Sequence, residues 1–212
     1  MRRVAVTRTR LAAVVAGLAV GVAGTVAVSG PARANERELA GTDLRLADGT
    51  RAGSVVFFGV NDHVTRVKLN VDLPDSEPMP GFHGIHVHAN NDPANGAGCV
   101  ADPSQPSATW FTAVDGHYAE SGQEHGAHAG DLPPIMLLEN GRGYSISITD
   151  RVLVDDLMGK AVILHAGGDN LGNVPVGTSP TQYTPNSPEA TATTAKTGNA
   201  GDRVACGVLA AG

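Results

Sequence analysis

Short apolar runs bounded by glycine, proline and asparagine dominate the chain from residue 44 onward, and they limit its fold more than any other feature. The run at 64–71 alternates apolar with polar side chains, as a strand with one solvated face does. Asp48-Gly49 and Asn140-Gly141 are typical of tight hairpin turns. We expect eight short strands near positions 44–46, 53–60, 64–71, 84–89, 135–138, 144–149, 161–166 and 203–209, one helical turn at 152–158, and no long helix. This spacing predicts an all-β sandwich or barrel.

Two long segments, at 90–134 and 167–202, are rich in glycine and proline and show no periodicity. Loops longer than about 12–15 residues in a folded domain are usually functional or disordered. The first contains Cys99 and three histidines, and the second ends just before Cys206. We therefore expect two long functional loops, with a disordered insertion rich in threonine and proline as the alternative for 176–202.

The first 34 residues have the layout of a secretory signal peptide. Four arginines precede an uncharged run at 11–28, and the small residues Ala32 and Ala34 end the segment. We expect cleavage after Ala34, which leaves 35–212 as the folded domain in a secreted or cell-envelope protein. The alternative is an uncleaved anchor, and only in that case is a membrane tether expected.

Removing residues 1–34 takes away five of 15 basic residues and none of 21 acidic ones, which leaves a formal charge of −11. This acidic balance argues against a nucleic-acid partner. It does not exclude an anionic substrate, because a local field can oppose the net charge. In an oxidising compartment the only two thiols, those of Cys99 and Cys206, are expected to pair.

Histidines at strand spacing indicate a metal site. His86 and His88 lie two positions apart in an expected strand, so both imidazoles face the same side. His117 follows in the first long loop, and His165 ends another expected strand. Four imidazole nitrogens in a tetragonal arrangement would suit Cu(II).

A second group of potential ligands lies close together in the sequence, at His125, His128 and Asp131. With one imidazole from elsewhere it would complete a closed four-ligand site of the kind zinc prefers. The alternative is a solvated loop with incidental histidines. Asp169, four residues after His165, is a candidate to orient a ligand through its second ring nitrogen.

Five segments, in order along the chain, resemble those of the secreted bacterial Cu/Zn superoxide dismutase family. They are Gly-Phe-His-Gly-Ile-His-Val-His at 81–88, Gly-His-Tyr at 116–118, His-Ala-Gly-Asp-Leu at 128–132, Leu-His-Ala-Gly-Gly-Asp-Asn at 164–170, and Gly-Asp-Arg-Val-Ala-Cys-Gly-Val at 201–208. The resemblance extends from about residue 50 to the C-terminus and implies a Greek-key β-sandwich or flattened barrel. It also implies that superoxide is dismutated to oxygen and hydrogen peroxide by a copper redox cycle.

The resemblance assigns roles residue by residue. It implies copper on His86, His88, His117 and His165, and zinc on His117, His125, His128 and Asp131, so that His117 bridges the two metals. Further roles fall to Asp169, which would bond ligands of both metals, to Arg203, which would guide superoxide, and to Cys99 and Cys206, which would form the disulfide. His83 would be structural.

Several alternatives stay open. His125 and His128 are only three positions apart, a shorter interval than the family commonly has, so a copper site without zinc is one possibility. The main alternative function is a secreted domain that sequesters copper or zinc without turnover; an adhesive sandwich is a third. Lys196 is either an ordinary solvated lysine or part of the guiding field. The Trp110-Phe111 pair is either a packing plug or an anchor, and both monomer and homodimer fit the sequence.

Overall fold

A computed structural model describes residues 37–96, 98–171 and 188–212. All strand pairs in these residues are antiparallel. The strands are β1 (Arg37–Arg45), β2 (Arg51–Asn61), β3 (Val64–Asp72), β4 (Gly81–His83), β5 (Ile85–His88), β6 (Ile135–Leu137), β7 (Arg142–Thr149), β8 (Ala161–His165) and β9 (Arg203–Val208). The predicted all-β class is confirmed. The expected signal peptide at 1–34 lies outside the described residues.

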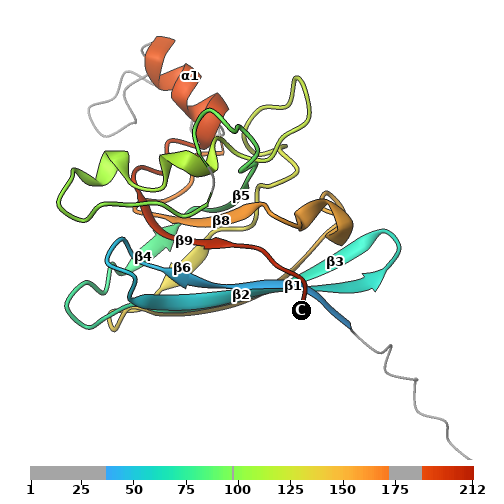
Figure 1. Cartoon of the computed structure of the whole chain (residues 1–212), viewed down its shortest axis with the longest axis horizontal. Helices are drawn as coiled ribbons and strands as arrows, with labels where there is room; N and C mark the ends of the chain where they lie inside the picture. The colour runs from blue at the N-terminus through green and yellow to red at the C-terminus, as the bar shows by residue number, and fades with distance from the viewer. Residues whose placement is uncertain (1–36, 97, 172–187) are drawn as a thin grey trace, which may run out of the picture. The chain divides into compact units, whose positions relative to one another are not determined.

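Seven strands form one curled sheet in the order β5-β8-β9-β1-β2-β3-β7, and β4 pairs with β6 in a second, two-stranded sheet. The neighbours β9–β1, β3–β7 and β5–β8 are not consecutive in the chain, so long connections cross the ends of the sheet, as in Greek-key folds. In Figure 1 the ribbon of β1, β2 and β3 forms one layer, and β5, β8 and β9 curl over it as the other. The long loops gather on the side of β5 and β8.

Alternating burial along the strands places the core between these layers. On β3, Val67, Leu69 and Val71 are buried while Lys68 and Asn70 are exposed, which confirms the alternation predicted for 64–71. The inward residues join Leu44, Phe57 and Ile85 among others in the main core. Burying each such side chain contributes about 1.5–3 kcal/mol relative to leaving it exposed.

β8 is buried on both faces, because two separate apolar clusters cover it. Val162 and Leu164 belong to the main core, whereas Ala161 and Ile163 face a smaller cluster on the opposite side. Phe111 from the first long loop fills that smaller cluster, so its reading as a packing plug is confirmed. The strand that ends at His165 is therefore held from both sides.

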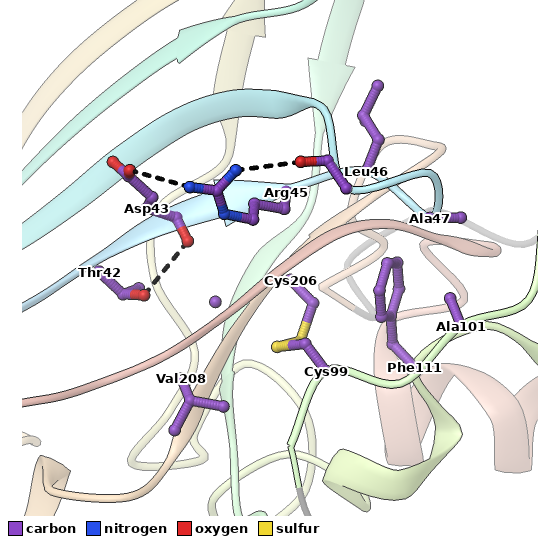
Figure 2. Close-up of a pocket in the computed structure, with 12 residues that line it drawn as sticks. Thr42, Asp43, Arg45, Leu46, Ala47, Cys99, Ala101, Phe111, Cys206 and Val208 are labelled. Carbon is purple, nitrogen blue, oxygen red and sulfur yellow. Dashed lines mark hydrogen bonds and ion pairs between the residues drawn. A yellow bond between two sulfur atoms is a disulfide. The ribbon is translucent and has the colours of Figure 1, made fainter.

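Cys99 and Cys206 form the disulfide that the sequence predicts. The bond joins the first long loop to β9 across 107 positions of the chain. Figure 2 shows the two sulfur atoms beside Phe111, along the wall of a pocket of about 290 Å³. The covalent link and the aromatic plug therefore hold the same stretch of loop against the sheet.

Helix α1 (Pro188–Thr197) contradicts the expectation that 167–202 forms only loop. Proline at its first position and glycine just after its last residue are the usual start and stop signals of a helix, and the sequence contained both.

The strand expected at 84–89 is shorter and is preceded by β4, which pairs with β6. The turn expected at 152–158 is the 3₁₀ helix η3 (Val154–Leu157). Among the described residues, no helix has the length and apolar character needed to cross a membrane.

Replacing both cysteines by serine (C99S/C206S) should lower the free energy of unfolding by about 2–5 kcal/mol, because a loop of this length is no longer closed in the unfolded chain. Denaturant unfolding of the variant and of the oxidised parent measures the difference. Equal midpoints and slopes for the two proteins would contradict a stabilising role for this disulfide.

Candidate metal centre

The backbone brings four histidines from three segments to one place. His86 and His88 lie on β5, which pairs with β8, and β8 ends at His165. The loop segment around His117 runs beside β5: Tyr118 donates its N–H to the Val87 carbonyl at 2.8 Å, and Ala89 donates to Gly116 at 3.0 Å. One ring nitrogen from each histidine lies within 4.8 Å of the others. The predicted set of four imidazoles therefore forms one buried cluster.

Each of these four rings is oriented through one nitrogen and leaves the other without a partner. His86 Nε2 contacts Asp169 Oδ2 at 2.9 Å, and His117 Nδ1 contacts Asp131 Oδ1 at 3.0 Å. His88 Nδ1 and His165 Nδ1 face the carbonyls of Asp115 and Gly201 at 2.9 and 3.1 Å. The remaining nitrogens have no hydrogen-bond partner among the described residues: His86 Nδ1, His88 Nε2, His117 Nε2 and His165 Nε2. Buried lone pairs oriented in this way are what a metal ion requires.

A second cluster lies on the far side of His117, and in it all the donors predicted for zinc meet. Asp131 Oδ1 is 3.0 Å from His117 Nδ1, 3.2 Å from His125 Nδ1 and 3.3 Å from His128 Nδ1. His117 Nδ1 and His128 Nδ1 are also 3.3 Å apart. A tetrahedron with zinc–ligand bonds of about 2.0–2.1 Å has edges of about 3.3–3.4 Å. Asp131 Oδ1 lies near this spacing from one nitrogen of each of the three imidazoles, and the short interval in the sequence does not keep His125 away.

Asp169 links the two clusters. Its Oδ2 contacts His86 Nε2, and its Oδ1 lies 3.0 Å from His125 Nε2. The side chain is 1% exposed, so these imidazoles take the place of solvent around the carboxylate. The orienting role predicted for Asp169 is thus compatible with its position. One carboxylate fixes a ring in each cluster.

His83 stands apart from both clusters. Its two nitrogens face the carbonyls of His165 and Met79 at 2.9 and 2.7 Å. The ring is buried, so these contacts tie the segment before β5 to the end of β8. This arrangement agrees with the structural role expected for His83.

Two glycines, absent from the candidate residues of the sequence analysis, make this packing possible. A Cβ on Gly130 would lie 2.3 Å from the Val87 carbonyl oxygen, where the backbone of 130 pairs with β5. A Cβ on Gly198, just after α1, would lie 2.2 Å from Asp169 Oδ1 and 2.3 Å from His125 Nε2. Gly198 also has a φ of 64°, the left-handed conformation that ends many helices. A glycine contributes here by the space it leaves, which a search for metal-ligating side chains does not detect.

Burial and neighbouring charges set the protonation of the clusters. Burial holds the pKa of His88 well below its ordinary value and lowers the pKa of His117 to about 4 and that of His165 to about 3. Burial also acts to lower the pKa of His125, but contacts with Asp131 and Asp169 outweigh it and raise that pKa to about 9. Imidazole contacts likewise hold the pKa of both carboxyl groups well below the usual range, against the effect of burial. Near neutral pH His88, His117 and His165 are uncharged, the form that binds metals.

Arg203 lies at the edge of the first cluster, on β9. Its guanidinium donates to the carbonyl oxygens of Phe111 and Asp115, the latter at 2.6 Å. The side chain lines a depression of about 440 Å³ that Lys196 also lines. Burial lowers the pKa of Arg203, although the nearby Asp115 carboxylate opposes this shift. A guanidinium remains charged at any physiological pH, so Arg203 contributes a fixed positive charge to a depression that Asp92 and Asp115 also line.

Comparisons with known proteins agree with this arrangement. Residues 51–209 match the family model described as copper/zinc superoxide dismutase. A Cu-Zn superoxide dismutase from Mycolicibacterium paratuberculosis is 33% identical over 178 residues, covering 81% of this chain and 74% of that protein. One from Mycobacterium tuberculosis is 32% identical over 176 residues, covering 80% of this chain and 69% of that protein. The crystal structure of the clock protein EA4 shares the fold, with a TM-score of 0.54 and 24% identity over 81% of this chain and 94% of that one.

Replacing Gly198 by alanine should weaken metal binding at the second cluster at least tenfold, because the new methyl group displaces His125 and Asp169. Titration with Co(II), followed by its visible absorption in a tetrahedral site, measures the affinity. Gly159→Ala is the matched control, since Gly159 also has a positive φ but nothing within 4 Å of the added carbon. Equal affinity in Gly198→Ala and the parent would show that this close packing does not hold the cluster.

Proposed function

The chain belongs to the copper/zinc superoxide dismutase family, and from that premise we propose how its buried histidines divide the work. It is a copper-dependent superoxide dismutase, which converts two superoxide anions and two protons into dioxygen and hydrogen peroxide. The observation that carries the detailed proposal is the convergence of four unpartnered imidazole nitrogens beside the charged Arg203.

We assign copper to His86, His88, His117 and His165, and zinc to His117, His125, His128 and Asp131. The donor chemistry supports each choice: four imidazole nitrogens suit copper, and three imidazoles with one carboxylate suit zinc. When bound, copper supplies one-electron exchange with superoxide, and zinc supplies a fixed positive charge on the far side of the His117 ring. His117 belongs to both sets because its Nε2 faces one cluster and its Nδ1 the other.

His117 also has the position to move a proton. Its Nε2 is buried without a protein partner, while its Nδ1 is fixed against Asp131. We infer that Nε2 takes up a proton in one half of the cycle and delivers it to the peroxide product in the other. Between these transfers Asp131 keeps the ring in place, so that the nitrogen returns to the same position after each turnover.

Arg203 attracts and orients the substrate. The mature chain is strongly acidic, so a superoxide anion is repelled at long range unless a local field opposes the net charge. The Arg203 guanidinium shares the Asp115 carbonyl with His88 and supplies such a field, against the Asp92 and Asp115 carboxylates of the same depression. Two backbone carbonyls fix its direction. We keep Lys196 as an exposed lysine on the same depression, with a minor part in this field.

The disulfide and the mycobacterial relatives favour an extracytoplasmic enzyme. We propose that residues 1–34 are removed as a signal peptide and that 35–212 act outside the cytoplasm, either released or retained in the cell envelope. N-terminal sequencing of the exported protein tests this: a first residue of Asn35 supports the cleavage site, and a retained Met1 contradicts it.

Superoxide decay after pulse radiolysis tests the assignment of copper. The parent loaded with copper and zinc should accelerate the decay, and His86→Ala should lose both bound copper and this activity, because one of four convergent donors is gone. Metal analysis of the same samples separates loss of copper from loss of turnover. Full activity in His86→Ala would refute the copper site, and bound copper without activity in the parent would favour metal sequestration instead.

Arg203→Ala should leave the metal content unchanged, lower kcat/KM for superoxide by about tenfold or more, and flatten its dependence on ionic strength, because the steering charge is removed. Decay rates at several salt concentrations measure both effects. Arg142→Ala, which removes an exposed arginine of β7 that pairs with Asp72 of β3, controls for the change in net charge. An unchanged salt dependence in Arg203→Ala would show that Arg203 does not steer the substrate.

A further inference from the structure

Two non-glycine residues with left-handed backbone flank the 3₁₀ turn η2 (Thr112–Val114), just before His117. Phe111 has φ 55° and ψ 22°, and Asp115 has φ 65° and ψ −157°. The angles of Asp115 fall in a region that glycine alone adopts without strain. Such strain persists only where the surrounding contacts enforce it. The contacts of Asp115 therefore indicate the role of this strained peptide.

The backbone carbonyl of Asp115 makes two contacts that matter for the proposed reaction. It accepts a hydrogen bond from His88 Nδ1 at 2.9 Å and another from the Arg203 guanidinium at 2.6 Å. One oxygen atom thus orients a proposed copper ligand and the proposed substrate guide. A rotation of this peptide would move both groups.

The side chain of Asp115 fixes that peptide from the other side. Its Oδ2 accepts from the backbone N–H groups of Asn91 and Asp92 at 2.7 and 2.8 Å, and its Oδ1 accepts from Asn95 Nδ2 at 2.7 Å. The segment that contains these donors begins three residues after His88, the last residue of β5. Hydrogen bonds to an ionised carboxylate are roughly twice as strong as those between neutral groups. The carboxylate therefore anchors the strained peptide to the segment that follows the strand carrying His88.

Glycine would adopt these angles freely but would lack the anchor, and alanine would lack the anchor and still be strained. We propose that Asp115 is a positioning residue that fixes Arg203 and His88 relative to each other, with its carboxylate holding a strained peptide whose carbonyl orients both. The proposal rests on the assignment of His88 to copper and of Arg203 to the substrate. An amide oxygen at position 115 can still accept from the two backbone N–H groups, but it loses the charge and the oxygen that accepts from Asn95 Nδ2.

The variants Asp115→Ala, Asp115→Gly and Asp115→Asn, made in the mature metal-loaded protein, test the proposal. Three quantities are measured. The first is the rate at which phenylglyoxal modifies Arg203, which peptide mass mapping follows. The second is the Cu(II) EPR spectrum, and the third is kcat/KM for superoxide. Asp115→Ala should speed modification of Arg203 several-fold, shift the EPR spectrum and lower kcat/KM roughly ten- to a hundredfold, as expected when reacting groups are misplaced. Asp115→Gly, which avoids the strain, should be affected less than Asp115→Ala, and Asp115→Asn, which keeps the two backbone hydrogen bonds, should be affected least.

Asp102→Ala is the matched control, because the Asp102 carboxylate also caps a turn of this loop, at Ser104, without contacting Arg203. It should leave all three quantities unchanged. If the alanine and glycine variants match the parent in Arg203 reactivity and EPR spectrum, or if the asparagine variant is as impaired as alanine, the proposal is wrong. If the parent itself shows no turnover while Arg203 reactivity and the EPR spectrum respond as expected, the proposed function fails and the positioning role of Asp115 is retained.

Discussion

Four buried imidazole nitrogens, among the side chains that the structure describes, have neither a hydrogen-bond partner nor an ion-pair partner: His86 Nδ1, His88 Nε2, His117 Nε2 and His165 Nε2. A buried polar group left unpaired costs about 1–3 kcal/mol, so this concentration is too costly to result from packing alone. These nitrogens converge from β5, β8 and the loop around His117, where a bound metal ion would supply the partner that each one lacks. Metal binding and folding stability are therefore linked, because a ligand that binds only the native state stabilises it.

The two clusters are built with unequal rigidity. The proposed copper donors on β5 and β8 lie in the sheet: β8 is covered by apolar side chains on both faces, and the edge strand β5 also pairs with the loop at Tyr118 and Gly130. Apart from His117, which we assign to both sets, the proposed zinc donors lie in a loop whose shape depends on backbone pairing at Gly130 and on the end of α1, which contacts His125. Asp169 connects the two, since its oxygens contact His86 and His125. The loop cluster thus takes part of its order from the sheet cluster, through one buried carboxylate.

Side-chain chemistry at fixed spacing could be predicted from the sequence, whereas backbone contributions could not. The two-residue interval between His86 and His88 is sufficient to place both rings on one face, and the pairing of Cys99 with Cys206 follows from their being the only two thiols. Helix α1 was missed because its alanine- and threonine-rich sequence has no apolar face, although its terminal signals were present. Asp115 was missed because it acts largely through its backbone carbonyl, and Gly198 because it acts through the room that its missing side chain leaves. Both effects depend on neighbours that are distant in the chain.

Strand β9 both holds the first long loop and carries Arg203, the proposed substrate guide. Arg203 and Cys206 lie three residues apart on β9, and each holds the same loop, one through the carbonyls of Phe111 and Asp115 and the other through the disulfide to Cys99. Phe111 packs in the cluster that contains Cys206, so its carbonyl is fixed by the same apolar contacts that shield the disulfide. The loop around the guanidinium is therefore held by the disulfide, by the apolar contacts of Phe111 and by the hydrogen bonds of Arg203 itself. β5 pairs with β8 on one side and with Tyr118 and Gly130 of the loop on the other, so loosening the loop affects the buried His88 together with the entrance to the metal centre.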